Sequence, residues 1–156
     1  MMDIKPGIGL GDIKYGITIE ELIQLLGKPD QIDEEECFEG SGEWTRDLLY
    51  FSRGLNFTFD KADDYRLGVI TVLGSGYRLL GKELFGLPKD AVKRLLAKAT
   101  SEISKIEDWT WTEEDSLECL DHDGLGMLFW FHSGYLSEIQ CGCLFEADNE
   151  TVIWPA

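Results

Sequence analysis

The sequence has 156 residues, of which 30 are acidic and 14 are basic, so its formal net charge at pH 7 is −16. Such a charge repels nucleic-acid phosphates and anionic membranes, and it attracts basic proteins from a distance. Hydrophobic residues make up 44% of the chain, enough for a substantial core. We therefore expect one compact domain, residues 1–156, with neither a nucleic-acid nor a membrane partner.

The N-terminal segment, residues 1–7, lacks the basic region and apolar run of a secretory signal. No apolar run in the sequence approaches the ~20 residues that span a bilayer. We expect a cytoplasmic protein. Its four cysteines are then reduced thiols, although their even number leaves disulfides open.

One stretch of the chain recurs after 70 residues. Residues 16–26 (GITIEELIQLL) resemble residues 86–96 (GLPKDAVKRLL), and the same offset superposes residues 54–59 on residues 124–129. A single ungapped offset that joins separate segments indicates two copies of one module. The expected modules are residues 8–73 and 78–145.

In the first copy, Thr18 and Glu21 match the capping box that begins a helix, and Gly27 and Pro29 end that helix. An acidic strand and loop are expected at residues 31–43. The period then changes to two, which predicts an antiparallel meander. Its strands are expected at residues 49–51, 55–60 and 67–73.

The second copy predicts a helix that begins at Pro88 and then four strands within residues 106–145. The strand at residues 125–132 is apolar on both sides, and we expect it to pack between the modules; the alternative is a partner surface. The predicted fold class is α+β, with two pseudo-symmetric modules that each pack one helix on an antiparallel meander. The two sheets are expected to be continuous or packed face to face.

A metal site is the first chemistry to consider, because thiolates and imidazoles are zinc ligands. Structural zinc sites usually use two close ligand pairs, and this sequence has one, at Cys141 and Cys143. Residues two apart on a strand point the same way, so these cysteines are expected to be small buried side chains. We expect no metal. The alternative is a small-ligand or metal-dependent enzyme or sensor that uses Cys119, Cys141, Cys143, His122 and His132.

Enzyme motifs are scarce. The histidines have no Gly-x-Ser-x-Gly elbow nearby, and the glycines at residues 74–76 lack the lysine of a phosphate-binding loop. The acidic clusters lack the apolar setting that raises one carboxyl pKa for acid catalysis. We therefore expect no catalytic residues and no cofactor.

Acidic residues interleaved with tryptophans are the remaining signal. Carboxylates steer and pair with Lys or Arg, while tryptophan supplies contact area and cation–π attraction, which suits a basic protein partner. The alternative for Trp109 and Trp111 is that they fill the core. The expected partner-binding residues are Asp33, Glu34, Glu35, Glu36, Trp44, Trp109, Trp111, Glu113, Glu114, Asp115 and Trp130.

Residues 16–22 (GITIEEL) together with residues 26–30 (LGKPD) resemble the helical start of the β-lactamase-inhibitor-protein-like and outer-membrane-lipoprotein (SmpA/OmlA) type of module. The second copy departs from this pattern, because residues 97–99 (AKA) replace the Gly-Lys-Pro terminator. The lipobox cysteine of the lipoproteins has no counterpart near the N-terminus.

The resemblance implies a protein-binding scaffold without an active site. A small acidic protein of this kind is also similar to bacterial immunity proteins, the antitoxins that neutralise secreted toxins. The expected function is binding and inhibition of a basic toxin, for instance a nuclease, and the oligomeric state is left open.

Overall fold

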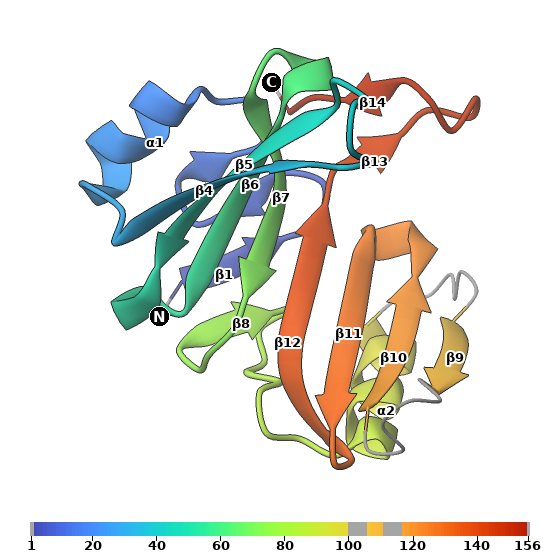
Figure 1. The fold of residues 1–156 in the computed structure, drawn as a ribbon. Helices are drawn as coiled ribbons and strands as arrows, with labels where there is room; N and C mark the ends of the chain where they lie inside the picture. The colour runs from blue at the N-terminus through green and yellow to red at the C-terminus, as the bar shows by residue number, and fades with distance from the viewer. Residues whose placement is uncertain (1, 100–105, 111–116, 156) are drawn as a thin grey trace.

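The computed structural model describes residues 2–99, 106–110 and 117–155. Its main feature is one antiparallel sheet of eight strands, which faces the viewer in Figure 1. The strands, in spatial order, are β4 (Gln31–Glu36), β5 (Trp44–Tyr50), β6 (Leu55–Asp60), β7 (Arg66–Val72), β12 (Tyr135–Gly142), β11 (Met127–His132), β10 (Leu117–His122) and β9 (Ile106–Thr110).

A second layer covers one side of this sheet, and Figure 1 shows β1 and α2 behind it. In the smaller sheet, the N-terminal strand β1 pairs in parallel with β8, so residues 2–5 lie beside residues 77–79. Neither helix of the described chain is long and apolar enough to cross a bilayer. The elements are β1 (Met2–Lys5), β2 (Gly9–Leu10), β3 (Ile13–Lys14), β8 (Tyr77–Leu79), α1 (Ile19–Leu26) and α2 (Lys89–Ala99).

Five short elements complete the described fold. Three 3₁₀ turns, η1 (Phe51–Arg53), η2 (Lys61–Asp63) and η3 (Asp123–Leu125), connect neighbouring strands of the large sheet. A C-terminal hairpin, β13 (Leu144–Phe145) with β14 (Val152–Ile153), follows directly after β12.

The core lies between the large sheet and the second layer. A row of paired residues, Leu48, Phe57, Ile70, Cys141 and Met127, crosses five strands, and none is more than 2% exposed. Burying a large apolar side chain stabilises a fold by roughly 1.5–3 kcal/mol. The inward row therefore requires strands on both sides of the β7–β12 junction to share one core.

Helix α1 forms where the sequence predicts it. The Thr18 hydroxyl accepts a hydrogen bond from the Glu21 amide, and the Glu21 carboxylate accepts one from the Thr18 amide, both at 3.2 Å. Gly27 ends the helix at φ +85°, a conformation that glycine adopts without strain. Leu22 is fully buried, which attaches the helix to the core.

The predicted fold class, two pseudo-symmetric modules that each pack a helix on a meander, is wrong. The fold is mostly β: strands account for 47% of the described chain, and its two helices have eight and 11 residues. Strands β7 and β12 join the two groups of strands into one continuous sheet, which is one of the two expected sheet arrangements, whereas β1 and β8 pair in a second sheet that the expected modules do not contain. Backbone pairing explains the outcome, because joined strands satisfy N–H and C=O groups that separate sheets would leave at open edges.

The expected position of the strand at residues 125–132 is also wrong. Strand β11 does not lie between two modules, because it pairs with β10 on one side and β12 on the other. The junction at the middle of the sheet is made by β7 and β12 instead. The outward side chains of β11 therefore lie on the face of the sheet that is turned away from the second layer.

Candidate partner-binding surface

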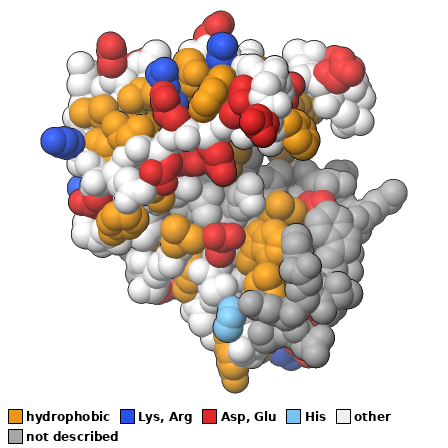
Figure 2. All heavy atoms as spheres, viewed as in Figure 1, with side chains coloured by type: hydrophobic (Ala, Val, Ile, Leu, Met, Phe, Trp, Pro, Cys, Tyr) orange, Lys and Arg blue, Asp and Glu red, His pale blue; other side chains and the backbone are white. Residues whose placement is uncertain are grey.

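The large sheet has one face away from the core, which we call the outer face. Side chains alternate along a strand, so every second residue of each strand lies there. At the described outward positions of β4, β5 and β6 there are four carboxylates and no lysine or arginine. Figure 2 shows acidic side chains across the upper part of this face. The four are Asp33, Glu35, Asp47 and Asp60.

The acidic hairpin, residues 31–47, contributes most of this charge. It consists of β4, the loop 37–43 and the first part of β5, and it carries seven carboxylates against one arginine. Strand β4 is an edge strand of the described sheet. Charged side chains on an edge strand oppose pairing with other chains, so part of the pattern protects the edge from aggregation.

The four predicted acidic residues of β4 do not share one role. Glu34 pairs with Arg46, whose guanidinium lies 3.9 Å from the centre of the Tyr65 ring. Glu36 accepts hydrogen bonds from the amides of Gly40 and Gly42 at 2.8 and 2.9 Å. Those two carboxylates hold the hairpin together. The outward Asp33 and Glu35 remain exposed and are the pair placed to meet a partner.

The loop of the hairpin presents Phe38, which is 74% exposed, the highest value among the large hydrophobic residues of the described chain. The loop is braced on both sides of this residue. The Cys37 amide donates to the Glu43 carbonyl at 2.8 Å, and the Ser41 amide donates to the Phe38 carbonyl at 2.9 Å. The ring is therefore displayed on an ordered turn.

Phe38 is not among the partner-binding residues predicted from the sequence, although the sequence contains a signal for it. A single aromatic residue stands in the run Glu-Cys-Phe-Glu-Gly-Ser-Gly-Glu, where no alternating pattern gives it a buried position. Contact with a partner is one use for such a side chain, and exposed aromatic residues are enriched at interfaces.

The predicted tryptophans are dispersed. Trp44 is half-buried and opposite Glu36, on the side of the sheet that faces the core. Trp130 is half-buried on the outer face of β11. Trp109 is part of β9, but its side chain is outside the described part of the structure. Trp111, Glu113, Glu114 and Asp115 also lie outside the described residues.

The other half of the outer face is hollowed. One hollow of about 420 Å³ is lined by Leu73, Leu117, Trp130, Ser137 and Glu138. Burial raises the pKa of the Glu138 carboxyl above its ordinary value. A carboxylate beside a tryptophan in a hollow of this size can accept a basic or polar side chain from a partner.

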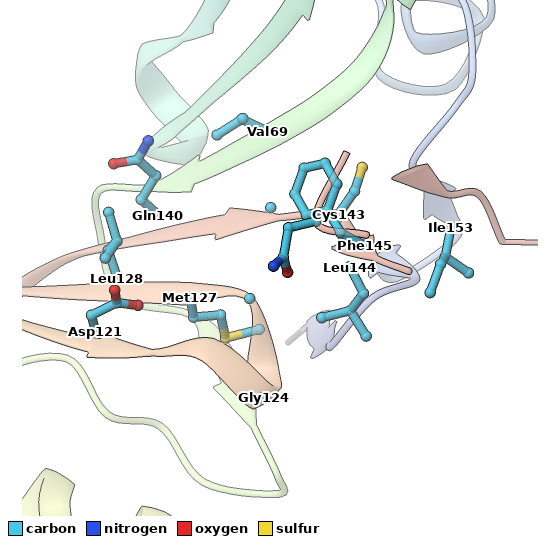
Figure 3. Close-up of a pocket in the computed structure, with 13 residues that line it drawn as sticks. Val69, Asp121, Gly124, Met127, Leu128, Gln140, Cys143, Leu144, Phe145 and Ile153 are labelled. Atoms are coloured by element: carbon cyan, nitrogen blue, oxygen red, sulfur yellow. The ribbon is translucent and has the colours of Figure 1, made fainter. Parts of the chain in front are cut away.

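A second hollow, of about 610 Å³, lies between the sheet and the C-terminal hairpin. Figure 3 shows Asp121, Leu128 and Gln140 on the strand side, opposite Phe145 and Ile153 of the hairpin. Gly126, at φ +67°, allows the chain at residues 142–144 to pack closely against it, because a Cβ there would lie 3.1 Å from both the Gly142 carbonyl oxygen and Leu144 Cδ2. The hollow thus continues the outer face as far as the C-terminal hairpin.

The cysteines and histidines considered for chemistry are mostly enclosed. Burial raises the pKa of the Cys141 and Cys143 thiols to about 12 and of the Cys119 thiol to about 11. At neutral pH they are thiols, which are poor nucleophiles and poor metal ligands. His122 is 1% exposed, and its Nδ1 accepts a hydrogen bond from the Leu125 amide at 3.2 Å. His132 is exposed at the end of β11.

The described residues contain no group of three or more His, Cys, Asp or Glu side chains that could hold a metal ion. Comparisons with protein-family models, with curated proteins and with solved structures each find no match to this chain.

Proposed function

We propose that this protein binds a basic protein partner through the acidic hairpin and the adjoining outer face of the sheet. The observation that carries the proposal is Phe38, a largely exposed aromatic ring on a braced loop surrounded by carboxylates. Carboxylates provide attraction at long range, and an aromatic side chain provides the desolvated contact at the centre of an interface.

The structure of the loop suits an anchor residue. Binding costs free energy when side chains and loops must be ordered at the interface. Here the Glu36 carboxylate already ties Gly40 and Gly42 to the base of the loop, so little further ordering of the backbone is needed. Asp33 and Glu35 then lie on the neighbouring strand, where they can pair with lysines or arginines around the site that receives Phe38.

We further propose that the partner is a toxin and that this protein is its immunity protein. A nuclease is the favoured class, since an enzyme that binds a phosphate backbone needs a basic surface. An acidic protein covering that surface blocks the enzyme without any chemistry of its own. The resemblance of residues 16–22 and 26–30 to inhibitor modules and the net charge of −16 support this proposal.

The test of the anchor compares two exposed phenylalanines. Capture from extracts of the native host with immobilised protein supplies the partner, and binding is then measured with the purified pair. Phe38→Ala should weaken binding by about 2 kcal/mol or more while leaving unfolding unchanged. Phe51→Ala is the control, because Phe51 is 63% exposed but lies at the other end of β5. Equal effects of the two substitutions would contradict the proposed anchor.

The test of attraction compares two charge reversals. Glu35→Lys should slow association, because it replaces an attractive charge with a repulsive one. It should also reduce the dependence of the association rate on salt, since salt screens charges that are more than a Debye length of ~8 Å apart at physiological ionic strength. Asp12→Lys is the control, an exposed carboxylate in the β2–β3 turn. Stopped-flow association over a salt series measures both. If host extracts contain no basic partner that binds in mild salt, the proposal fails as a whole.

A further inference from the structure

A small apolar cavity lies apart from the outer face, between the segment that follows β8 and the C-terminal part of α2. Its volume is about 200 Å³. Leu79, Leu84 and Leu96 form its interior, and none of the three is more than 2% exposed. Leu80, Leu95, Lys82 and Lys98 complete the lining. Among the described residues, five leucines and two lysines give the cavity an apolar wall with positive charge.

The charge around this cavity is opposite to that of the molecule. Residues 78–98 carry six basic side chains against two acidic ones, a local charge of +4, whereas the rest of the chain carries −20. Of its acidic groups, the Glu83 carboxylate accepts a hydrogen bond from the Gly76 amide at 2.8 Å. The cavity therefore lies in the most basic segment of an acidic protein.

The two lysines of the cavity differ from the other basic residues of this segment. Arg78 pairs with Asp3 at 3.0 Å, and Lys89 pairs with Glu118 at 2.7 Å. Lys82 and Lys98 are exposed, and neither forms an ion pair with a described residue. Two ammonium groups beside an apolar cavity suit a ligand that has an anionic head and an apolar tail.

The backbone at Leu80 is an independent observation. Leu80 and Gly81 form a two-residue turn with φ values of +52° and +80°, closed by reciprocal hydrogen bonds between Leu79 and Lys82 at 2.8 and 3.0 Å. A turn with two positive φ values favours Asn-Gly or Gly-Gly at its centre, and leucine is strained there. The side chain is also 43% exposed at the cavity.

A strained, partly exposed leucine destabilises the fold in two ways. Its backbone conformation is unfavourable, and its apolar side chain contacts water. Such outliers cluster at ligand sites, where the surrounding structure over-determines them. Asparagine at this position would relieve the strain but would remove one apolar wall of the cavity. The turn therefore gives no reason for a leucine at position 80, whereas a place in the cavity wall does.

We propose that this cavity binds a single-chain amphiphile with an anionic head, its alkyl chain among the five leucines and its head between Lys82 and Lys98. The volume sets the size class. Sites for drug-sized molecules occupy ~300–1,000 Å³, so a cavity of about 200 Å³ suits a ligand smaller than these, such as one short alkyl chain. The site is separate from the acidic hairpin, so the proposal does not depend on the basic protein partner.

The first experiment measures binding of a series of alkyl carboxylates, from hexanoate to dodecanoate, to the full chain by calorimetry. Affinity should rise about fourfold per added methylene until the cavity is full and then level off. Octanoate should bind on the order of tenfold more tightly than 1-octanol, since hydrogen bonds to charged groups are the stronger ones. Absence of saturable octanoate binding, or equal affinity for the alcohol, would overturn the proposal.

The second experiment separates the head group from the tail. Lys82→Gln with Lys98→Gln should reduce octanoate affinity to that of 1-octanol and leave 1-octanol binding unchanged. Lys61→Gln, at an exposed lysine of η2, is the matched control and should change neither. Octanoate binding that survives loss of both cavity lysines would exclude the assigned head-group site.

The third experiment uses the strained turn. Leu80→Asn should raise the melting temperature, because asparagine accepts the turn conformation, and it should weaken binding of both octanoate and 1-octanol. Opposite changes in stability and binding identify a residue retained for its ligand. A variant that melts at a lower temperature and binds octanoate as before would show that Leu80 has only a structural role.

Discussion

The two halves of the large sheet, β4–β7 and β9–β12, are alike on the inner face and different on the outer one. On β6 and β11 the inward residues are large and fully buried, as Phe57 and Phe129 show. The outward residues are Asn56 and Thr58 on β6 but Leu128 and Trp130 on β11. The first half therefore presents polar and acidic groups, and the second half presents apolar side chains around two hollows.

This difference follows from the unequal contributions of inward and outward side chains to the free energy of folding. Large inward side chains contribute several kcal/mol each, so both halves retain them. Exposed outward positions contribute less to the fold, so they can take on separate binding chemistry. One sheet thus provides a charged region for attraction beside an apolar region for contact.

The largest expected effect tests whether the inner faces of the two halves contribute equally to stability. Phe57→Ala and Phe129→Ala should each lower the free energy of unfolding by about 3–5 kcal/mol, because both rings are fully buried and leave a cavity. Urea unfolding of both variants measures this. A cost at Phe129 that is much smaller than the cost at Phe57 would show that the second half contributes less to the shared core.

The glycines after the 3₁₀ turns form a second matched pair. Gly54 follows η1 at φ +63°, and Gly126 is at φ +67° directly after η3. Alanine at either position should cost about 1–3 kcal/mol because it is strained there. Gly68→Ala is the control, since Gly68 has no positive φ and a Cβ would meet nothing closer than Asp63 Oδ2 at 4.0 Å. A similar loss at Gly68 would show that the positive φ of Gly54 and Gly126 does not account for the cost.

The outer faces should respond unequally. Trp130→Ala should lower stability by about 1–2 kcal/mol, because half of a large aromatic side chain leaves its packing, whereas Thr58→Ala should cost about 1 kcal/mol or less, for its hydrogen bond to Asp47. Thermal unfolding of the two variants makes the comparison. Equal losses would remove the distinction between a polar and an apolar outer half.

The smallest expected effect depends on pH. Burial raises the folded-state pKa of Glu138 above its ordinary value of 4.5, so stability is lost as pH rises from that value through the folded pKa. Glu138→Gln removes the loss and should make the protein more stable than the unmodified chain at pH 7, with little difference at pH 4. Urea titrations at both pH values measure this. An advantage that is the same at both would assign the effect to something other than ionisation.

Much of the local structure follows from the sequence. The capping box at Thr18 and Glu21 and the glycine at position 27 bound α1 as expected. The alternation at residues 55–60 places Leu55, Phe57 and Phe59 in the core. These features depend on neighbouring residues, and short-range sterics and hydrogen bonds decide them. The separate roles of the four acidic residues of β4 were not predictable, because they depend on the pairing with Arg46 across the hairpin and on the conformation of the loop at residues 37–43.

Tertiary structure decided the pairings. Strands β1, β2, β3 and β8 have two to four residues, too few for a periodic pattern, and β1 finds its parallel partner more than 70 residues away. The pairing of β7 with β12 likewise depends on backbone N–H and C=O groups, which every sequence carries. Side-chain patterns along the chain determine which residues turn inward, because that is a local property of alternation or helical period. Which strand lies beside which is set by the shared core and by the need to pair every buried backbone group, and both arise only when the whole chain is folded.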